Sequence, residues 1–232
     1  TVKKRSSKLL PGISSLVFTK FLLNNTVFVS LEDMTEGLPN YTEIPYSIEM
    51  DETTLKYYNS YEQFIKRMAT DSDINNRKYL RQYCRRMLTI PDAPHCIEDE
   101  TSEDGNLLFA APEIEEFTTN KDLALLDIIN TKVLAGEKVL VYYNDVGTTN
   151  LGDHIRLLIN SYGYKSAELK ASVKAEKREE FINKLIKDKY NVLICNPSLI
   201  ETGLNLLDFT TIVFYQLGYN LNTMRQASRR SW

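Results

Sequence analysis

The chain has 232 residues, of which 43% are hydrophobic and 25% are charged, and its formal net charge is −3 at pH 7. These values are ordinary for a globular protein with a sizeable core, folded as one large domain or two small ones, and they exclude a polycation. Three cysteines at irregular spacing exclude a disulfide framework and indicate a reducing compartment, which we take to be the cytoplasm. No apolar run reaches the roughly 20 residues that a membrane span needs, and no signal-peptide pattern is visible, so we expect no membrane partner.

Charge is segregated along the chain. Residues 1–30, 64–90 and 128–232 are net positive, whereas 31–63 and 91–127 are net negative. Separate basic surfaces with neutralising flanks are typical of nucleic-acid sites, and solvated faces produce the same pattern. The charge distribution by itself leaves both interpretations open.

The first half predicts a mainly helical region. An apolar segment covers 16–29, and residues 41–50 alternate apolar and polar side chains as a half-buried strand does. Asp51 is suited to cap a helix over 51–68, and a second helix is expected over 75–88. The side chains expected to face inward are Leu55, Tyr58, Tyr61, Ile65 and Met68 on the first helix, and Leu80, Tyr83, Cys84 and Met87 on the second.

The opposite face of the second helix is basic. It carries Arg77, Lys78, Arg81, Arg85 and Arg86, which either face solvent or follow a phosphate backbone. An acidic, proline-containing loop then covers 91–116, and its segment 98–104 is expected to be exposed or disordered. We therefore place a domain boundary after this loop, which gives a first domain over 1–117 and a second over 118–232.

The second half alternates helices and strands. Helices of this length between short apolar strands imply right-handed crossovers and a parallel sheet with helices on both faces. The expected helices are 120–134, 150–162 and 174–187, with Leu123, Leu126, Ile129 and Val133 inward on the first, and the expected strands are 138–143, 164–169, 191–195 and 211–215. A last helix is expected to open near Asn222, a residue type suited to capping.

The end of the chain carries three motifs that resemble helicase motifs V and VI of superfamily 2, in the form of the Swi/Snf-type DNA-dependent ATPases. Residues 196–206 read NPSLIETGLNL and keep the family's G-L-N-L, but Leu199-Ile200-Glu201 replaces its A-G-G. Residues 212–221 read IVFYQLGYNL, with Gln216 where the family has Asp. The third motif begins at Gln226 and places Arg230 at its first arginine.

Earlier segments extend the resemblance over most of 16–232. Leu38-Pro39, the alternating segment, a tyrosine-rich helix and the LRQYC run over 80–84 follow the order of the sequence that joins the two motor lobes in that family. Motif IV maps to 139–143, and the family's L-D-G-S appears as LKAS over 169–172. The fold implied is the second RecA-like lobe of a superfamily 2 motor, preceded by a helical linking region and the end of the first lobe.

The resemblance also implies roles for particular residues. Enzymes of this kind hydrolyse ATP with Mg²⁺ between two lobes, and arginines of the second lobe neutralise charge that builds on the γ-phosphate. It assigns Arg230 to catalysis and to the nucleotide, together with Gln226 and Gly203. It assigns contacts with double-stranded DNA to Thr202 and Asn205. Ser172 and Lys174 stand at the start of the helix expected over 174–187, where a helix N-terminus either binds a backbone phosphate of the DNA or is simply capped by Ser172.

The chain lacks the other half of such a site. It has no G-x-x-x-x-G-K-[ST] loop to cradle phosphates and no D-E-x-H-like acidic box. We therefore expect a fragment of a longer polypeptide, with its first RecA-like lobe in cis, that does not hydrolyse ATP alone. The alternative is a degenerate, non-catalytic interaction domain that kept the motor fold, and the losses in the motifs favour it somewhat.

Two other groups of residues suggest chemistry at first sight. Cys84, His95 and Cys96 lack the spacing of a zinc site and have no fourth ligand nearby, so we expect no metal site. With only His95 and His154 present, no nucleophile–base–acid set can be identified, and His154 is expected at the surface of its helix.

Overall fold

The computed structural model describes residues 14–27, 29, 42–70, 76–96, 98–102, 104–115, 117–144, 149–200, 204, 206–218 and 220–229. The chain divides into two compact units, Thr1–Glu43 and Ile44–Trp232. In the first unit a short helix α1 (Ser15–Val17) continues as a π-helix η1 (Phe18–Leu22). This division does not test the boundary expected at 117–118, which stays a prediction.

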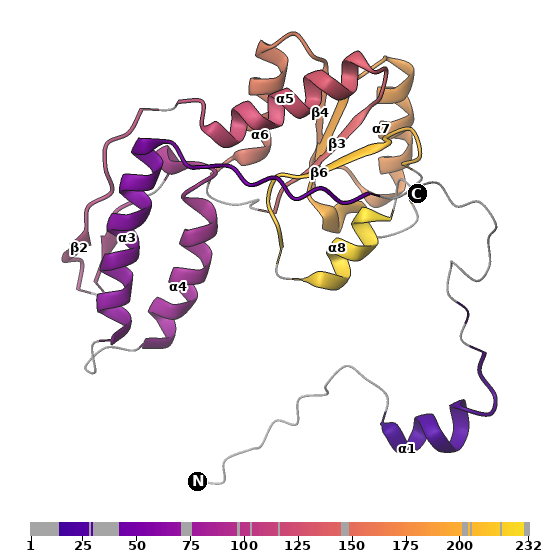
Figure 1. Cartoon of the computed structure of the whole chain (residues 1–232), viewed down its shortest axis with the longest axis horizontal. Helices are drawn as coiled ribbons and strands as arrows, with labels where there is room; N and C mark the ends of the chain where they lie inside the picture. The colour runs from indigo at the N-terminus through magenta and orange to yellow at the C-terminus, as the bar shows by residue number, and fades with distance from the viewer. Residues whose placement is uncertain are drawn as a thin grey trace. The chain divides into compact units, whose positions relative to one another are not determined.

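The second unit begins with an extended segment and two helices. Residues 42–50 form no strand and Ile44, Tyr46 and Ile48 are exposed, so the expectation of a half-buried strand was wrong for this structure. Helix α3 (Glu52–Thr70) is capped as predicted, because Asp51 Oδ1 accepts from the Thr54 amide at 2.8 Å. Helix α4 (Asn76–Thr89) packs beside α3 (Figure 1).

The inward faces of α3 and α4 agree in part with those that periodicity predicted. Tyr61 and Ile65 are buried as expected, and Tyr58, Met68 and Tyr83 are partly buried against the same cluster. The buried side chains of α3 are Thr54, Tyr57, Tyr61, Phe64 and Ile65, whereas Leu55 is 45% exposed. On α4, Met87 is buried as expected, but Leu80 and Cys84 are exposed. The buried core between these helices is therefore rich in tyrosine and phenylalanine, together with Ile65, Met87 and Ile90.

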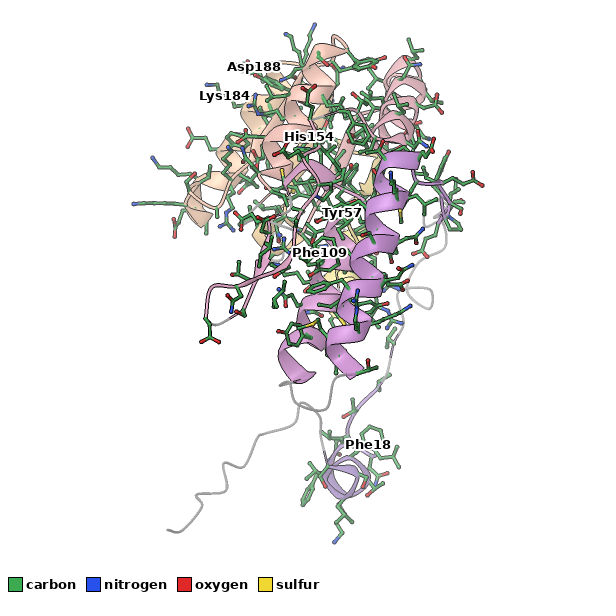
Figure 2. The ribbon with its side chains drawn as sticks, turned by 90° about the vertical axis from the view of Figure 1, so that its left-hand side faces the viewer. Phe18, Tyr57, Phe109, His154, Lys184 and Asp188 are labelled. Carbon is green, nitrogen blue, oxygen red and sulfur yellow. The ribbon has the colours of Figure 1, made fainter. Side chains whose placement is uncertain are left out.

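A hairpin covers the aromatic core of α3 and α4. Strands β1 (Glu100–Thr101) and β2 (Leu107–Phe109) pair antiparallel, and Phe109 stacks on Tyr57 with ring centroids 6.0 Å apart (Figure 2). The Glu100 carboxylate accepts from Tyr61 Oη at 3.0 Å and pairs with Arg86 Nε at 3.3 Å. The expectation that 98–104 is merely exposed or disordered was therefore wrong at Glu100, which is drawn inward by these donors. Because Arg86 pairs with Glu100, it does not act as one of the solvent-facing residues of the basic face.

The remaining strands form one parallel sheet. Its strands are β3 (Val139–Tyr142), β4 (Ser166–Leu169), β5 (Val192–Cys195) and β6 (Thr211–Phe214), in the order β4-β5-β3-β6. In register, Val139 of β3 lies opposite Val192 of β5 and Thr211 of β6. The predicted strands are confirmed, with ends that differ by at most two residues.

Helices cover both faces of this sheet (Figure 1). Val139 and Val141 of β3 pack against α5 (Asn120–Leu134) and α6 (Leu151–Ser161), while Leu140 and Tyr142 pack toward α7 (Ala175–Lys187) and α8 (Leu221–Ser228). Such alternation is what a central strand buried on both faces requires. The RecA-like α/β fold is thereby confirmed, although Leu123 of α5 is 48% exposed rather than inward. None of the described helices is long and apolar enough to cross a membrane.

Candidate functional site

Polar side chains meet at the carboxyl ends of β6, β3 and β5. The Gln216 side chain accepts from the Asn144 backbone amide at 2.9 Å, and Asn144 Nδ2 donates to the Gln216 carbonyl at 3.0 Å. Asn196 Nδ2 in turn donates to the Asn144 carbonyl at 3.3 Å. Because the carboxyl ends of parallel strands share one edge, these residues connect three strands that are far apart in the sequence.

The helical region joins this network through Asp92. Its carboxylate, 1% exposed, accepts from Gln216 Nε2 at 2.5 Å and pairs with Lys121 Nζ of α5. Burial raises the pKa of the Asp92 carboxyl, and the Lys121 ammonium and the Gln216 amide oppose that rise. We call Asp92, Gln216, Asn144 and Asn196 the edge relay.

A second buried carboxylate lies next to the relay. Asp122 forms a capping box with Thr119 at the start of α5 and also accepts from Tyr215 Oη at 2.9 Å. His154 Nε2 of α6 lies 3.2 Å from both Asp122 oxygens, and its side chain is 13% exposed (Figure 2). The expectation that His154 is a surface residue was wrong, because the Asp122 carboxylate draws the imidazole inward.

The two carboxylates differ in their pKa. Burial alone would raise the pKa of Asp122, but hydrogen bonds from His154, Thr119 and Tyr215 lower it below its usual value. Burial raises the pKa of Tyr215 well above its usual value, so this phenol stays a donor. These contacts satisfy the hydrogen-bonding capacity of the Asp122 carboxylate, so Asp122 serves as a structural anchor for the end of β6.

The histidine and cysteine residues do not form a metal centre within the described part of the chain. His95 and His154 lie with ring centroids 6.0 Å apart, and Cys96 Sγ lies 3.7 Å from the Thr149 carbonyl. No group of three or more His, Cys, Asp or Glu among the described residues is placed to bind an ion.

Glu168 of β4 is a third buried carboxylate of the sheet. Tyr143 Oη donates to it at 2.5 Å and Lys170 Nζ lies 3.3 Å away. Gly152 of α6 makes room for this pair, because a Cβ there would overlap the Glu168 carboxylate and the Tyr143 hydroxyl. Glu168 is therefore held by its own neighbours.

The segments of motifs V and VI meet on one face of the sheet. The 3₁₀-helix η3 (Pro197–Ile200) packs against α8, with Ile200 and Ala227 in the same buried cluster. Asn220 caps α8 by accepting from the amides of 222 and 223, so the cap predicted at Asn222 lies two residues earlier. Gln226 projects from α8 as an exposed side chain. Arg230, Gly203, Thr202 and Asn205 lie outside the described residues.

The two remaining sequence-predicted residues lie before α7. Ser172 and Lys174 are both exposed, and the N-cap position is Lys174, so Ser172 does not cap the helix. Arg178, which the sequence analysis did not single out, donates to the Val173 carbonyl at 3.2 Å and to the Leu199 carbonyl of η3 at 2.7 Å. It thereby ties the turn that carries Ser172 and Lys174 to the motif V segment. An arginine one turn into an amphipathic helix gave no signal of this bond in the sequence.

The sequence and the fold can be compared with those of known proteins. The family model of the helicase conserved C-terminal domain matches residues 120–232. The C-terminal part of the Fun30 ATPase domain is 17% identical with a TM-score of 0.62, and the match covers 83% of this chain and 80% of that chain. The C-terminal domain of the Sulfolobus solfataricus SWI2/SNF2 ATPase is 15% identical with a TM-score of 0.51, and the match covers 71% and 66% of the two chains. No curated protein sequence matches the chain.

The core domain of the same Sulfolobus solfataricus ATPase is 14% identical with a TM-score of 0.57, and the match covers 79% of this chain but only 36% of that one. At these identities the likeness to solved structures is one of fold. The family model and the fold agree with the resemblance that the motifs carry. Residues 120–232, slightly less than half of the chain, match the helicase conserved C-terminal domain, and the chain shares the fold of these Fun30 and SWI2/SNF2 ATPase domains.

Proposed function

We propose that the chain is the C-terminal part of an ATP-dependent DNA translocase or helicase. In that enzyme it supplies the arginine side of the ATP cleft and part of the DNA-contacting surface. The observation that carries the proposal is the packing of η3 against α8 in a helicase C-terminal domain, because it brings the motif V and motif VI segments to one face. ATP and Mg²⁺ are the cofactors of the whole enzyme.

In this proposal Arg230 contacts the γ-phosphate. Its guanidinium neutralises charge that develops on the transferred phosphoryl group, and Gln226 and Gly203 complete the nucleotide side. The exposed position of Gln226 on α8 supports this assignment, since a residue that faces another lobe has to project from its own.

The residues of this chain do not fit a phosphate-cradling loop or a Mg²⁺ site. The sequence has no G-x-x-x-x-G-K-[ST], and the described residues offer no acidic cluster for an ion. Both therefore belong to the first RecA-like lobe, which the proposal places in the same polypeptide.

Double-stranded DNA is the second partner. Ser172 and Lys174 lie exposed at the amino end of α7, where backbone amides and the helix dipole favour an anion such as a backbone phosphate. The Arg178 bond to η3 supports a common surface for these residues and for Thr202 and Asn205 of motif V. Such contacts follow the phosphate backbone and carry little sequence preference.

The test compares ATP hydrolysis by the 232-residue chain with hydrolysis by the full polypeptide that contains it, each with and without double-stranded DNA. We expect no hydrolysis above a contaminant control from the chain alone, and DNA-stimulated hydrolysis from the full polypeptide. Hydrolysis by the isolated chain would contradict the division of labour. A full polypeptide that contains a phosphate-binding loop and is still inactive would favour the non-catalytic interaction domain instead.

A further inference from the structure

In the edge relay, the group that donates and the group that accepts each hydrogen bond are fixed. A backbone amide can only donate, so the Asn144 amide fixes the side-chain oxygen of Gln216 toward it and the Gln216 NH₂ group toward Asp92. Lys121 donates to the other Asp92 oxygen. Both oxygens at position 92 must therefore accept, and a carboxylate is the side chain that meets this demand.

The relay joins parts that the sequence separates. Asp92 follows α4 of the helical region, and its bond to Gln216 spans 124 positions. Gln216 is the second residue of the connection from β6 to α8, and Asn196 begins the connection from β5 to η3. Gly218 in the first connection lies so close that a Cβ there would be 3.2 Å from the Asn144 carboxamide. The relay thus fixes the start of both motif-bearing segments.

We propose that Asp92 is a positioning residue for ATP hydrolysis. Through Gln216 and Asn144 it sets the motif V and motif VI segments in one register relative to the helical region. This inference rests on the proposed function. Where the family that the motifs resemble has Asp, this chain has Gln216, and Gln216 binds a carboxylate that comes from the helical region. The register of the catalytic edge therefore depends on a residue outside the helicase C-terminal domain.

Because the donor and acceptor roles in the edge relay are fixed, two single variants and one double variant can test it. In Asp92→Asn the new amide must face either Lys121 or Gln216, and both are donors, so one bond is lost. In Gln216→Glu two buried carboxylates meet, and one bond is lost again unless a proton is taken up. In the double variant D92N/Q216E the NH₂ group introduced at position 92 donates to the carboxylate introduced at position 216. That carboxylate also accepts from the Asn144 amide, so every hydrogen bond and the net charge are restored, with the negative charge moved from position 92 to position 216.

The experiment measures kcat and KM for ATP, with saturating double-stranded DNA, in the full polypeptide. Each single variant is expected to lower kcat by roughly 10-fold with little change in KM, because the arginine contact acts in the transition state. The double variant is expected to return kcat to within about 3-fold of the wild type. Asn120→Ala is the matched control: it removes another bond between the regions, from Asn120 Nδ2 to the Glu49 carbonyl at 3.0 Å, and should leave kcat unchanged.

Hydrogen exchange of the Asn144 amide gives a second readout in the same proteins. Each single variant loses the bond that holds the side chain at position 216 in place, so protection should fall in each single variant and recover in the double variant. If a single variant folds poorly, recovery in the double variant still tests the relay. Losses of kcat that multiply in the double variant, or single variants that change neither kcat nor exchange, would overturn the inference. If the wild type hydrolyses no ATP, the proposed function fails, and a double variant that does not regain Asn144 protection would show separately that the relay is wrong.

Discussion

The carboxyl and amino edges of the sheet hold their polar groups differently. At the carboxyl edge, buried carboxylates bind donors from distant segments, as Asp92 does with Gln216. At the amino edge, Glu137 accepts from the Thr211 hydroxyl at 2.6 Å and the Thr210 hydroxyl at 3.1 Å, and pairs with Lys132 at 3.2 Å. These amino-edge partners all lie within the lobe and are more exposed.

The difference shows what each edge does. Parallel sheets present their chemistry at the carboxyl ends of the strands, so this edge has to be fixed accurately and shielded from water. The amino edge has only to close the fold. Substitutions at the carboxyl edge should therefore affect activity and stability, and those at the amino edge stability alone.

The largest expected effect is a loss of ATP turnover, which should follow a substitution in motif VI but not one at the amino edge. Arg230→Ala in the full polypeptide should lower DNA-stimulated turnover by roughly 10³–10⁵-fold, because the arginine stabilises charge in the transition state. Lysine should rescue poorly, since a point charge cannot replace the planar guanidinium. Glu137→Gln at the amino edge is the control and should leave turnover unchanged. Near-normal turnover of Arg230→Ala would contradict the role assigned to motif VI and the expected difference between the two edges.

Strand β6 allows the two edges to be compared by stability within one element. Tyr215→Phe, just after its carboxyl end, should cost about 1–3 kcal/mol, because the buried Asp122 loses a donor. Thr211→Val, at its amino end, should cost less than about 1 kcal/mol, since Glu137 keeps Thr210 and Lys132 as partners and its side chain is 31% exposed. Equilibrium unfolding in urea measures both. An equal or reversed order of the two costs would show that the edges do not differ.

Helix α7 gives a comparison for DNA binding, because it carries a lysine near each end. Lys174→Ala should weaken binding of double-stranded DNA about 3-fold to 10-fold and reduce the salt dependence of binding by about one released counterion. Lys184→Ala, about three turns farther along the same helix (Figure 2), should change neither. Fluorescence anisotropy at several salt concentrations measures both quantities. Salt-insensitive, sequence-dependent binding by the wild type would contradict this surface.

The smallest expected effect is on acid stability. The pKa of Asp122 is lowered in the folded state, so the unfolded state binds more protons, and the stability that Asp122 supplies is present above its ordinary pKa of 3.8 and lost as pH falls further. The pKa of Glu137 is also lowered, mainly by the Thr211 hydroxyl, with the same sign. Asp122→Asn should flatten the acid limb of stability against pH more than Glu137→Gln does, because Asp122 is buried. Urea midpoints between about pH 3 and pH 6 test this order.

Local sequence patterns determined the elements and the fold class. The strands and helices of the second half have strong apolar runs with polar connections, and short-range rules such as the Asp51 cap need only neighbours a few residues away. Three short motifs were sufficient to indicate a helicase lobe, because they combine residue type with fixed spacing. Arg230, Gly203, Thr202 and Asn205 lie outside the described residues, so their roles stay predictions.

Tertiary structure decided which polar side chains are buried and which helix faces turn inward. Periodicity gave an inward stripe on α3, but packing against α4 and the β1–β2 hairpin selected Tyr57 and Phe64 and left Leu55 exposed. His154 was expected at the surface and is drawn inward by Asp122, 32 positions away. The bond between Asp92 and Gln216 spans 124 positions. Apolar patterns report how much surface a segment buries, whereas the partner of a buried charge depends on which segments the fold brings together.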